Sequence, residues 1–336
     1  MQYDGRCHAR ARKMPERTIR RPRNDGAATD TRDRTAPKRT TTMPKLNHLL
    51  AATDLSAPSR HAVERAAMLS QETGASLDLL HVVDRAPLER LRQLMLEPPD
   101  GLQERILGAA RERLGELAEA LRDRFGVSAG ARVAAGPVLA ELARHVDETA
   151  ADLIVCGARG ESFVRHSLLG STASRMLGKA TRPMLVVKQV PHEPYRATLV
   201  PVDFSPSSVR AVRHARSVAP KADIALLHAF EVPFEGHLRY ARVDEATIHH
   251  HRVVARQDAT RKLLELAGEA GLPPHAARLV VTHGDPSLRI VEQEQELNCD
   301  LIVIGKHGQN VVEELFLGSV TRHVLAESQC DVLVSV

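Results

Sequence analysis

Short apolar runs along the chain alternate with longer segments in which apolar residues recur every three or four positions. A run without polar alternation is typical of a strand covered on both faces, and strands that alternate with helices predict a parallel, doubly wound sheet. The first half of the chain predicts strands over residues 47–53, 76–83, 127–134, 152–157 and 183–188, and helices over 58–73, 101–125, 137–149 and 171–180.

The second half of the chain repeats the first at a nearly constant offset. Asp54, in HLLAATDLSAPS, matches Asp203, in ATLVPVDFSPSS, at an offset of 149 residues. The segment DLIVCGARG matches DLIVIGKHG at 148 residues, and LLGSTASRML matches FLGSVTRHVL at the same 148. Two copies are too few for a solenoid, so each copy should be a self-sufficient domain. The second copy predicts strands near residues 196–202, 222–229, 276–282, 300–304 and 331–336.

We therefore expect two tandem domains of the α/β class, each a Rossmann-like doubly wound fold with a five-stranded parallel sheet. They are predicted over residues 46–189 and 196–336, joined by a short linker that contains Pro191 and Pro194. A short linker keeps domains adjacent. The last strand of each domain is an apolar edge that needs cover, which edge-to-edge or face-to-face packing of the two domains would supply.

Charge sets the amino-terminal segment apart. Residues 1–43 hold 12 Lys and Arg against 5 Asp and Glu, a net charge of +7, so that the remaining residues carry −3 of the total of +4. This polar segment lacks apolar periodicity and predicts a disordered basic tail. It is either a solvated extension, with Met43 as an alternative start, or an arm for an anionic surface. Aromatic residues make up only 3% of the chain and Trp is absent, which argues against nucleic-acid binding by base stacking.

Hydropathy argues against a membrane protein, and cysteine usage argues against a disulfide-stabilised secreted protein. Every apolar run falls short of the ~20 residues that a membrane helix requires, so we expect no membrane association. The four cysteines, Cys7, Cys156, Cys299 and Cys330, form no CxxC pair, which predicts a reducing, cytoplasmic setting. Cys156 stands where the second copy has Ile304, so we interpret it as a small core residue.

Each copy carries three glycines at the same spacing around the start of its last helix. The first two follow a strand at the carboxyl edge of the sheet, where open α/β sheets bind ligands, and they let backbone amides approach a phosphate. The third begins a helix, whose free N–H groups and positive dipole end attract anions, and hydroxyls beside it can donate to phosphate. The pattern is Gly157-x2-Gly160-x9-Gly170-Ser171-Thr172 in the first copy and Gly305-x2-Gly308-x9-Gly318-Ser319 in the second.

Two further positions should converge on the same edge. Asp54 and Asp203 end the first strand of each copy, where a carboxylate can bind ribose hydroxyls, hold a Mg²⁺ that accompanies phosphates, or cap the following helix. Val82 and Ala229 end the second strand, where backbone groups can contact the edge of an adenine.

The sequence favours structural roles for the histidines over catalytic or metal-binding ones. His81 and His228 precede Val82 and Ala229, and we expect half-buried, hydrogen-bonded side chains in preference to catalytic ones. The run 249–251 consists of three histidines, but neighbouring residues on a helix point in different directions and are poor ligands for one ion. A solvated helix face is therefore the favoured interpretation.

The complete pattern, with D-x-S after the first strand and LLH in the second, resembles the universal stress protein family over residues 46–336. The resemblance implies a five-stranded parallel α/β fold, ATP binding, dimerisation through the last strand and a role in stress response. Its implied nucleotide-binding residues are Asp54, Val82, Gly157, Gly160, Gly170 and Ser171 in the first copy, and Asp203, Ala229, Gly305, Gly308, Gly318 and Ser319 in the second.

The two copies differ after the second glycine, where the family has a basic or amide residue. The second copy has Gln309 there and Lys306 and His307 within the loop. The first copy has Glu161, whose carboxylate repels phosphate unless Arg159, Arg165 or His166 offsets it. The second copy is therefore the better candidate binder.

We interpret the chain as a cytoplasmic stress-response regulator that binds ATP or a related adenine nucleotide, with Mg²⁺ as a candidate cofactor. Bound nucleotide would change its surface and hence its interactions with unidentified protein partners or with a second copy in a homodimer. A slow ATPase is the alternative, but the sequence shows no clear general base or arginine finger. A protein-interaction module that binds no nucleotide is the third interpretation.

Overall fold

The computed structural model describes residues 45–94, 101–160, 169–232, 235, 240–241, 243–308 and 317–336. The predicted basic tail lies outside these ranges, as do Glu161, Arg165, His166 and Gln309. The first half contains β1 (His48–Ala52), α1 (Ala57–Thr73), β2 (Ser76–Val83), α2 (Arg85–Leu94), α3 (Leu102–Phe125), β3 (Ala129–Ala135), α4 (Val138–Thr149), β4 (Leu153–Gly157), α5 (Ser171–Lys179) and β5 (Met184–Val187).

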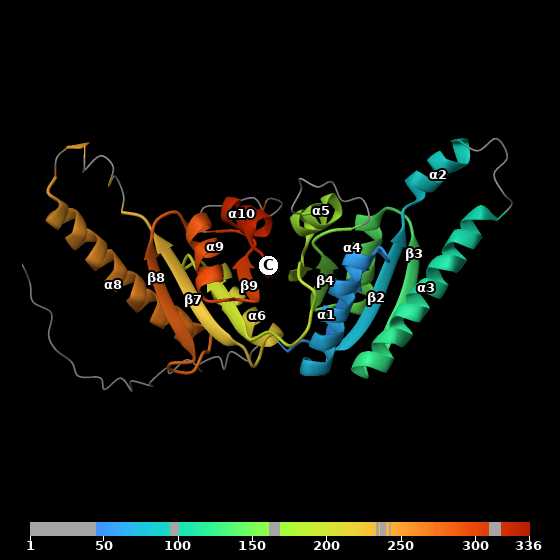
Figure 1. The fold of residues 1–336 in the computed structure, drawn as a ribbon, viewed down its shortest axis with the longest axis horizontal. Helices are drawn as coiled ribbons and strands as arrows, with labels where there is room; N and C mark the ends of the chain where they lie inside the picture. Colours follow the sequence, from blue (N-terminus) through green and yellow to red (C-terminus); the bar gives the residue numbers. More distant parts are fainter. Residues whose placement is uncertain are drawn as a thin grey trace, which may run out of the picture. The chain divides into compact units, whose positions relative to one another are not determined.

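The second half repeats this alternation of strands and helices (Figure 1). The predicted strands all form, with ends that differ by one or two residues, and α2 is an additional helix that the sequence pattern did not predict. The second half contains β6 (Ala197–Pro201), α6 (Pro206–Val218), β7 (Asp223–Phe230), α8 (Glu245–Glu269), β8 (Ala277–His283), α9 (Pro286–Glu296), β9 (Leu301–Gly305), α10 (Ser319–Glu327) and β10 (Asp331–Ser335).

The ten strands of the described residues form one sheet in the order β3-β2-β1-β4-β5-β10-β9-β6-β7-β8. Within each half, neighbouring strands are parallel and follow the same order. The halves join where β5 and β10 pair antiparallel, with Leu185 opposite Leu333. Both residues are fully buried. Edge-to-edge pairing, one of the two arrangements expected from the sequence, thus covers both apolar edges.

Apolar residues cover both faces of the sheet because successive strand side chains point to opposite faces. Leu49 and Ala51 of β1 pack with α1, α3, α6 and α8 in one core cluster, whereas Leu50 packs in a second cluster with α4, α5, α9 and α10.

A buried polar network lies where the two halves meet. The carboxylate of Asp331, 1% exposed, accepts hydrogen bonds from the backbone N–H groups of Lys188 (2.8 Å) and Gln189 (3.2 Å) and from the Tyr195 hydroxyl (2.7 Å). The Arg65 guanidinium, from α1, lies 3.4 Å from the same carboxylate and stacks over the Tyr195 ring at 4.1 Å. Burial raises the pKa of Asp331, although these contacts oppose the shift. The network therefore ties β10 of the second half to α1 and the linker.

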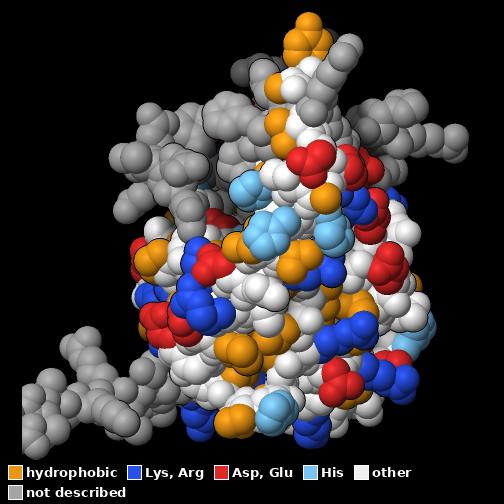
Figure 2. Space-filling view, turned by 90° about the vertical axis from the view of Figure 1, so that its left-hand side faces the viewer, with side chains coloured by type: hydrophobic (Ala, Val, Ile, Leu, Met, Phe, Trp, Pro, Cys, Tyr) orange, Lys and Arg blue, Asp and Glu red, His pale blue; other side chains and the backbone are white. Residues whose placement is uncertain are grey.

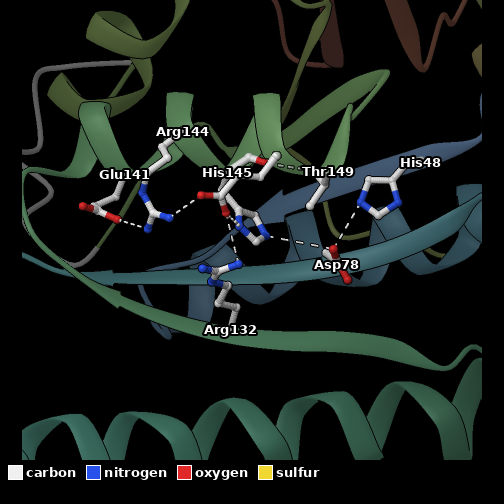
Figure 3. Close-up of polar contacts among 8 residues, drawn as sticks. His48, Asp78, Arg132, Glu141, Arg144, His145 and Thr149 are labelled. Carbon is white, nitrogen blue, oxygen red and sulfur yellow. Dashed lines mark hydrogen bonds and ion pairs between the residues drawn. The ribbon is translucent and has the colours of Figure 1, made fainter.

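A second polar cluster holds α4 against the amino ends of β1 and β2 (Figure 3). The Asp78 carboxylate lies 3.2 Å from Nε2 of His48 and 4.0 Å from Nε2 of His145, which is 3% exposed. Burial, and secondarily the charge of Arg132, lowers the pKa of His145. This cluster lies at the opposite edge of the sheet from the predicted site, so we interpret it as an anchor for α4.

The outer face of α8 is exposed and charged. Figure 2 shows Lys, Arg, Asp, Glu and His side chains interspersed on this side of the molecule. The histidines at 249–251 are all exposed, and no group of metal-ligating side chains was found within the described ranges. The solvated-face interpretation of these histidines is confirmed. None of the helices that the structure describes is both long and apolar enough to cross a bilayer.

His214 should make the fold sensitive to acid. Its Nδ1 lies 2.8 Å from the Ser335 hydroxyl, and burial, with a smaller effect of Arg210, lowers its pKa from 6.5 to about 4. The unfolded chain takes up this proton at a higher pH than the folded one. The free energy of unfolding should therefore fall by roughly 2–3 kcal/mol as the pH drops from about 6.5 to about 4.

Urea denaturation across this pH range measures the effect. His214→Asn retains a hydrogen-bonding group near Ser335 but does not titrate, so it should remove this part of the pH dependence. An unchanged pH dependence in the variant would show that other groups cause it.

Candidate functional site

In the described part of each half, a cavity lies at the carboxyl edge of the strands, and the predicted site residues line it. The first cavity has a volume of about 360 Å³ and the second about 280 Å³. The first is lined by Asp54, Val82, Gly157, Gly160, Gly170, Ser171 and Thr172, and the second by Asp203, Ala229, Gly305, Gly308, Gly318 and Ser319. Residues far apart in the sequence are thus brought together twice in the same arrangement.

The amino ends of α5 and α10 face these cavities. Their N-cap residues are Gly170 and Gly318, which have no side chain with which to cap the helix. By contrast, the side chain of Ser56 accepts a hydrogen bond from the first turn of α1. The first N–H groups of an α-helix have no partner within the helix, so the glycine caps leave these donors at the cavity wall. Such an arrangement is suited to an anion.

Close packing against the aspartates also requires the middle glycines. A Cβ at Gly160 would lie 2.4 Å from Oδ2 of Asp54, and one at Gly308 would lie 3.0 Å from Oδ2 of Asp203. At Gly157 a Cβ would lie 3.0 Å from the Arg159 carbonyl oxygen. The glycines are therefore needed by the loop itself, and their presence alone does not establish a ligand.

The two aspartates shape the turn before α1 and α6 without being the N-cap residues. Oδ1 of Asp54 accepts hydrogen bonds from the N–H (3.0 Å) and hydroxyl (2.5 Å) of Ser56, which is itself the N-cap. Oδ1 of Asp203 accepts the same two bonds from Ser205. Oδ2 of each aspartate lies beside the loop glycine, and both aspartates line their cavities.

The residue after each aspartate adopts a left-handed backbone conformation. Leu55 has φ 63° and Phe204 has φ 64°, values that are strained for residues with a branched or bulky side chain. Strain of this kind concentrates at functional sites, where the surrounding structure holds it in place. Its recurrence in both halves indicates that the turn geometry is specifically maintained.

The apolar walls of the cavities were missed in the sequence analysis. In the first cavity they come from Val138 and Leu142 of α4 and Met176 of α5. In the second, Pro286 and Ile290 of α9 take the corresponding place. A signal was present, because α4 and α9 each start directly after the third strand of their half and so begin at the same carboxyl edge.

The strand-end histidines are hydrogen-bonded to the end of the neighbouring strand, and His228 also lines the second cavity. Nδ1 of His81 lies 2.9 Å from the Thr53 carbonyl oxygen, and Nδ1 of His228 lies 2.9 Å from that of Val202, so each ring nitrogen donates to the end of the neighbouring strand. Burial lowers the pKa of His228, whose ring centroid lies 4.3 Å from that of Phe204. The half-buried, hydrogen-bonded interpretation is confirmed for both.

The basic residues of the two loops differ in whether their side chains line a cavity. Arg159 lines the first cavity and His307 the second. Lys306, only 4% exposed, does not line the second cavity, and its ammonium donates to the carbonyl oxygens of Gly178 and Ala180, each at 3.1 Å. Lys306 thus lies within the second loop, as its sequence position indicates, but its ammonium contacts α5 and does not line the second cavity.

The three described cysteines are core residues. Burial raises the pKa of Cys156, beside the first cavity, to about 12, and that of Cys299 to about 12. Burial likewise raises the pKa of Cys330 well above its ordinary value. Thiols held in this protonated state are poor nucleophiles, which supports a packing role.

Comparison with known proteins agrees with the fold and the repeat. The model of the universal stress protein family matches residues 45–188 and again 194–335. A universal stress protein of Mycolicibacterium smegmatis is 26% identical over 304 residues, covering 85% of this chain and 96% of the relative. One of Mycobacterium tuberculosis is 30% identical over 207 residues, covering 59% of this chain and 62% of the relative's length.

A solved structure has the same architecture. The crystal structure of a universal stress protein from Archaeoglobus fulgidus superposes with a TM-score of 0.65 at 22% identity, covering 87% of this chain and 99% of the other. At this identity the likeness concerns the fold, which is a mixed α/β fold of tandem domains.

Proposed function

The chain belongs to the universal stress protein family, and on this premise we propose that each of its two domains binds an adenine nucleotide and that the protein acts as a cytoplasmic stress-response regulator. The phosphates would lie at the amino ends of α5 and α10, and the base against the apolar wall supplied by α4 or α9. Val82 and Ala229 would contact the base with backbone groups.

One observation carries the proposal. In each half, a helix start capped only by glycine, a carboxylate and an apolar wall line the same cavity. These three features match the phosphate, ribose and base of a nucleotide, in the proportions expected of a largely apolar pocket with a few convergent polar groups. The same combination occurs twice although the wall residues differ between the halves.

A divalent cation fits the site only as a companion of the phosphates. The carboxylates of Asp54 and Asp203 supply hard oxygen ligands of the kind that Mg²⁺ prefers. Because no cluster of three or more metal-ligating side chains was found in the part of the chain that the structure describes, phosphate oxygens and water would complete the coordination. Mg²⁺ bound there would neutralise phosphate charge, while the helix N–H groups hold the phosphates in place.

Calorimetric titration of the full chain with ATP tests the proposal. We expect two ATP molecules per chain and a rise in the thermal unfolding midpoint that grows with ATP concentration, because a ligand that binds only the folded state stabilises it by mass action. Inorganic triphosphate should bind more weakly than ATP, since it leaves the apolar wall unfilled. The absence of heat and of any midpoint shift at millimolar ATP would refute the proposal.

A further inference from the structure

A lysine from the second half holds the carboxyl end of the phosphate-facing helix of the first half. Lys306 follows β9, and its ammonium donates to the carbonyl oxygens of Gly178, in the last turn of α5, and of Ala180, the C-cap residue. The last carbonyl groups of an α-helix have no partner within the helix, and a cation there is favoured by the helix dipole. Lys306 therefore completes α5 from outside its own domain.

The first half makes the reciprocal contact. Lys188 follows β5, and its ammonium donates to the carbonyl oxygen and to the hydroxyl of Ser328, each at 2.7 Å. Ser328 is the C-cap residue of α10, the phosphate-facing helix of the second half. Burial lowers the pKa of Lys188, while the nearby charge of Asp331 opposes that change. Each half thus sends one ammonium to the carboxyl end of the other half's helix.

The two lysines are not equivalent in the internal repeat. Lys306 aligns with Ala158, and Lys188 aligns with Val336. The two lysines follow adjacent strands of the repeated domain, since Lys306 comes after its fourth strand and Lys188 after its fifth. The ends of these two strands are hydrogen-bonded in both halves: the N–H of Ala158 donates to the Val187 carbonyl in the first, and the N–H of Lys306 donates to the Ser335 carbonyl in the second. The reciprocal contact is therefore produced by the junction of β5 and β10 and not inherited from the repeated domain.

We propose that Lys306 positions the phosphate-facing helix of the first cavity, and Lys188 that of the second, so that each nucleotide site depends on a residue of the opposite domain. Both lysines are positioning residues, since they act on the cavity through α5 and α10. The inference rests on the proposed function for its effect on affinity. It reverses the simplest expectation from the sequence, in which Lys306, between Gly305 and Gly308, serves the second cavity.

The test exchanges each lysine for methionine, which keeps length and packing but removes the charge. In the full chain, Lys306→Met should weaken ATP binding about tenfold in the first cavity and leave the second within about twofold, and Lys188→Met should do the reverse. To measure one site at a time, each lysine variant is combined with Ser319→Asp, which weakens binding in the second cavity, or with Ser171→Asp, which weakens binding in the first. Titration of each combined variant with ATP then gives the affinity of the remaining site. The two lysine variants serve as matched controls for one another.

A second readout does not require a nucleotide. Amide hydrogen exchange of the hydrogen-bonded N–H groups of α5 should rise in Lys306→Met, and that of α10 should rise in Lys188→Met, with the other helix unchanged. If the unmodified protein fails to bind ATP but this crossed pattern holds, the proposed function is wrong, whereas the positioning of α5 by Lys306 and of α10 by Lys188 stands. Changes confined to the lysine's own domain, or equal in both helices, would overturn it.

A second pair of substitutions, to glutamine, tests the inference if the methionine variants do not fold. Lys306→Gln and Lys188→Gln retain N–H donors without the charge, and they should show the same crossed pattern with a smaller change. Gln variants that fold but leave both helices and both affinities unchanged count against the inference.

Discussion

Replacing Ser171 with aspartate should weaken nucleotide binding in the first cavity roughly a hundredfold, and Ser319→Asp should do so in the second. Both side chains are exposed at the first position of a helix whose amino end faces its cavity. A carboxylate placed about 4 Å from a phosphate should cost about 2–3 kcal/mol after partial screening, which corresponds to roughly a hundredfold loss of affinity. The combined variant should bind ATP roughly a hundredfold more weakly at both sites.

The fold should survive these substitutions. An acidic residue in the first helical turn interacts favourably with the helix dipole and stabilises a helix by about 0.3–1 kcal/mol. Titration calorimetry gives the affinity and urea denaturation the stability. Ser174→Asp, an exposed position on the same helix that does not line the cavity, is the matched control and should change ATP affinity far less. Equal effects of Ser171→Asp and Ser174→Asp would show that the phosphates lie elsewhere.

Removing the Arg65 guanidinium should be strongly destabilising. Arg65→Met leaves the Asp331 carboxylate, 1% exposed, without its cationic partner at the junction of the two halves. Breaking a buried ion pair by removing one partner costs about 3–5 kcal/mol, because the remaining charge stays buried and uncompensated. Urea denaturation of the full chain should therefore show a large decrease in the free energy of unfolding.

The combined variant separates this explanation from simple loss of packing. Asp331→Asn keeps an acceptor for the N–H groups of Lys188 and Gln189 while removing the charge. In the Arg65→Met background it should restore much of the lost stability, so the two changes should be strongly non-additive. A small effect of Arg65→Met, or simple additivity of the two variants, would contradict the role given to this pair.

The fold and the composition of the cavities could be predicted from the sequence because the signals are local. Uninterrupted apolar runs specify strands covered on both faces, and the repeated spacing of Gly157, Gly160 and Gly170 places them around one helix start. The carboxyl-edge rule then brings Asp54 and Val82 to the same place. The two cavities contain every site residue that these rules selected.

The junction between the halves could be predicted only as one of two alternatives. The apolar runs at β5 and β10 show that these edges must be covered, but a hydrophobic edge specifies neither its partner nor the direction of pairing. The placement of Asp331 against Arg65 follows from that pairing. The contact of the Lys306 ammonium with α5 depends on this pairing as well, so the sequence of the loop could not indicate it.

The helix α2 was missed for a different reason. Residues 85–94 carry Leu88, Leu91 and Leu94 at helical spacing, but the segment spans only ten residues, with a proline at its third position, between a strand and a much longer helix, and the sequence analysis did not assign it. The apolar walls supplied by α4 and α9 were not predicted because only glycines, hydroxyls and carboxylates were taken as candidate site residues. Apolar side chains such as Leu142 and Ile290 serve both the core and the cavity, and only the structure separates the two roles.

A crystal structure of the full chain grown with ATP and Mg²⁺ tests the central claim most directly. The account predicts phosphate groups within hydrogen-bond distance of the N–H groups of Ser171 and Ser319, with the adenine against Leu142 in one domain and Ile290 in the other. Cavities filled by protein side chains, or nucleotide bound only away from the amino ends of α5 and α10, would contradict it.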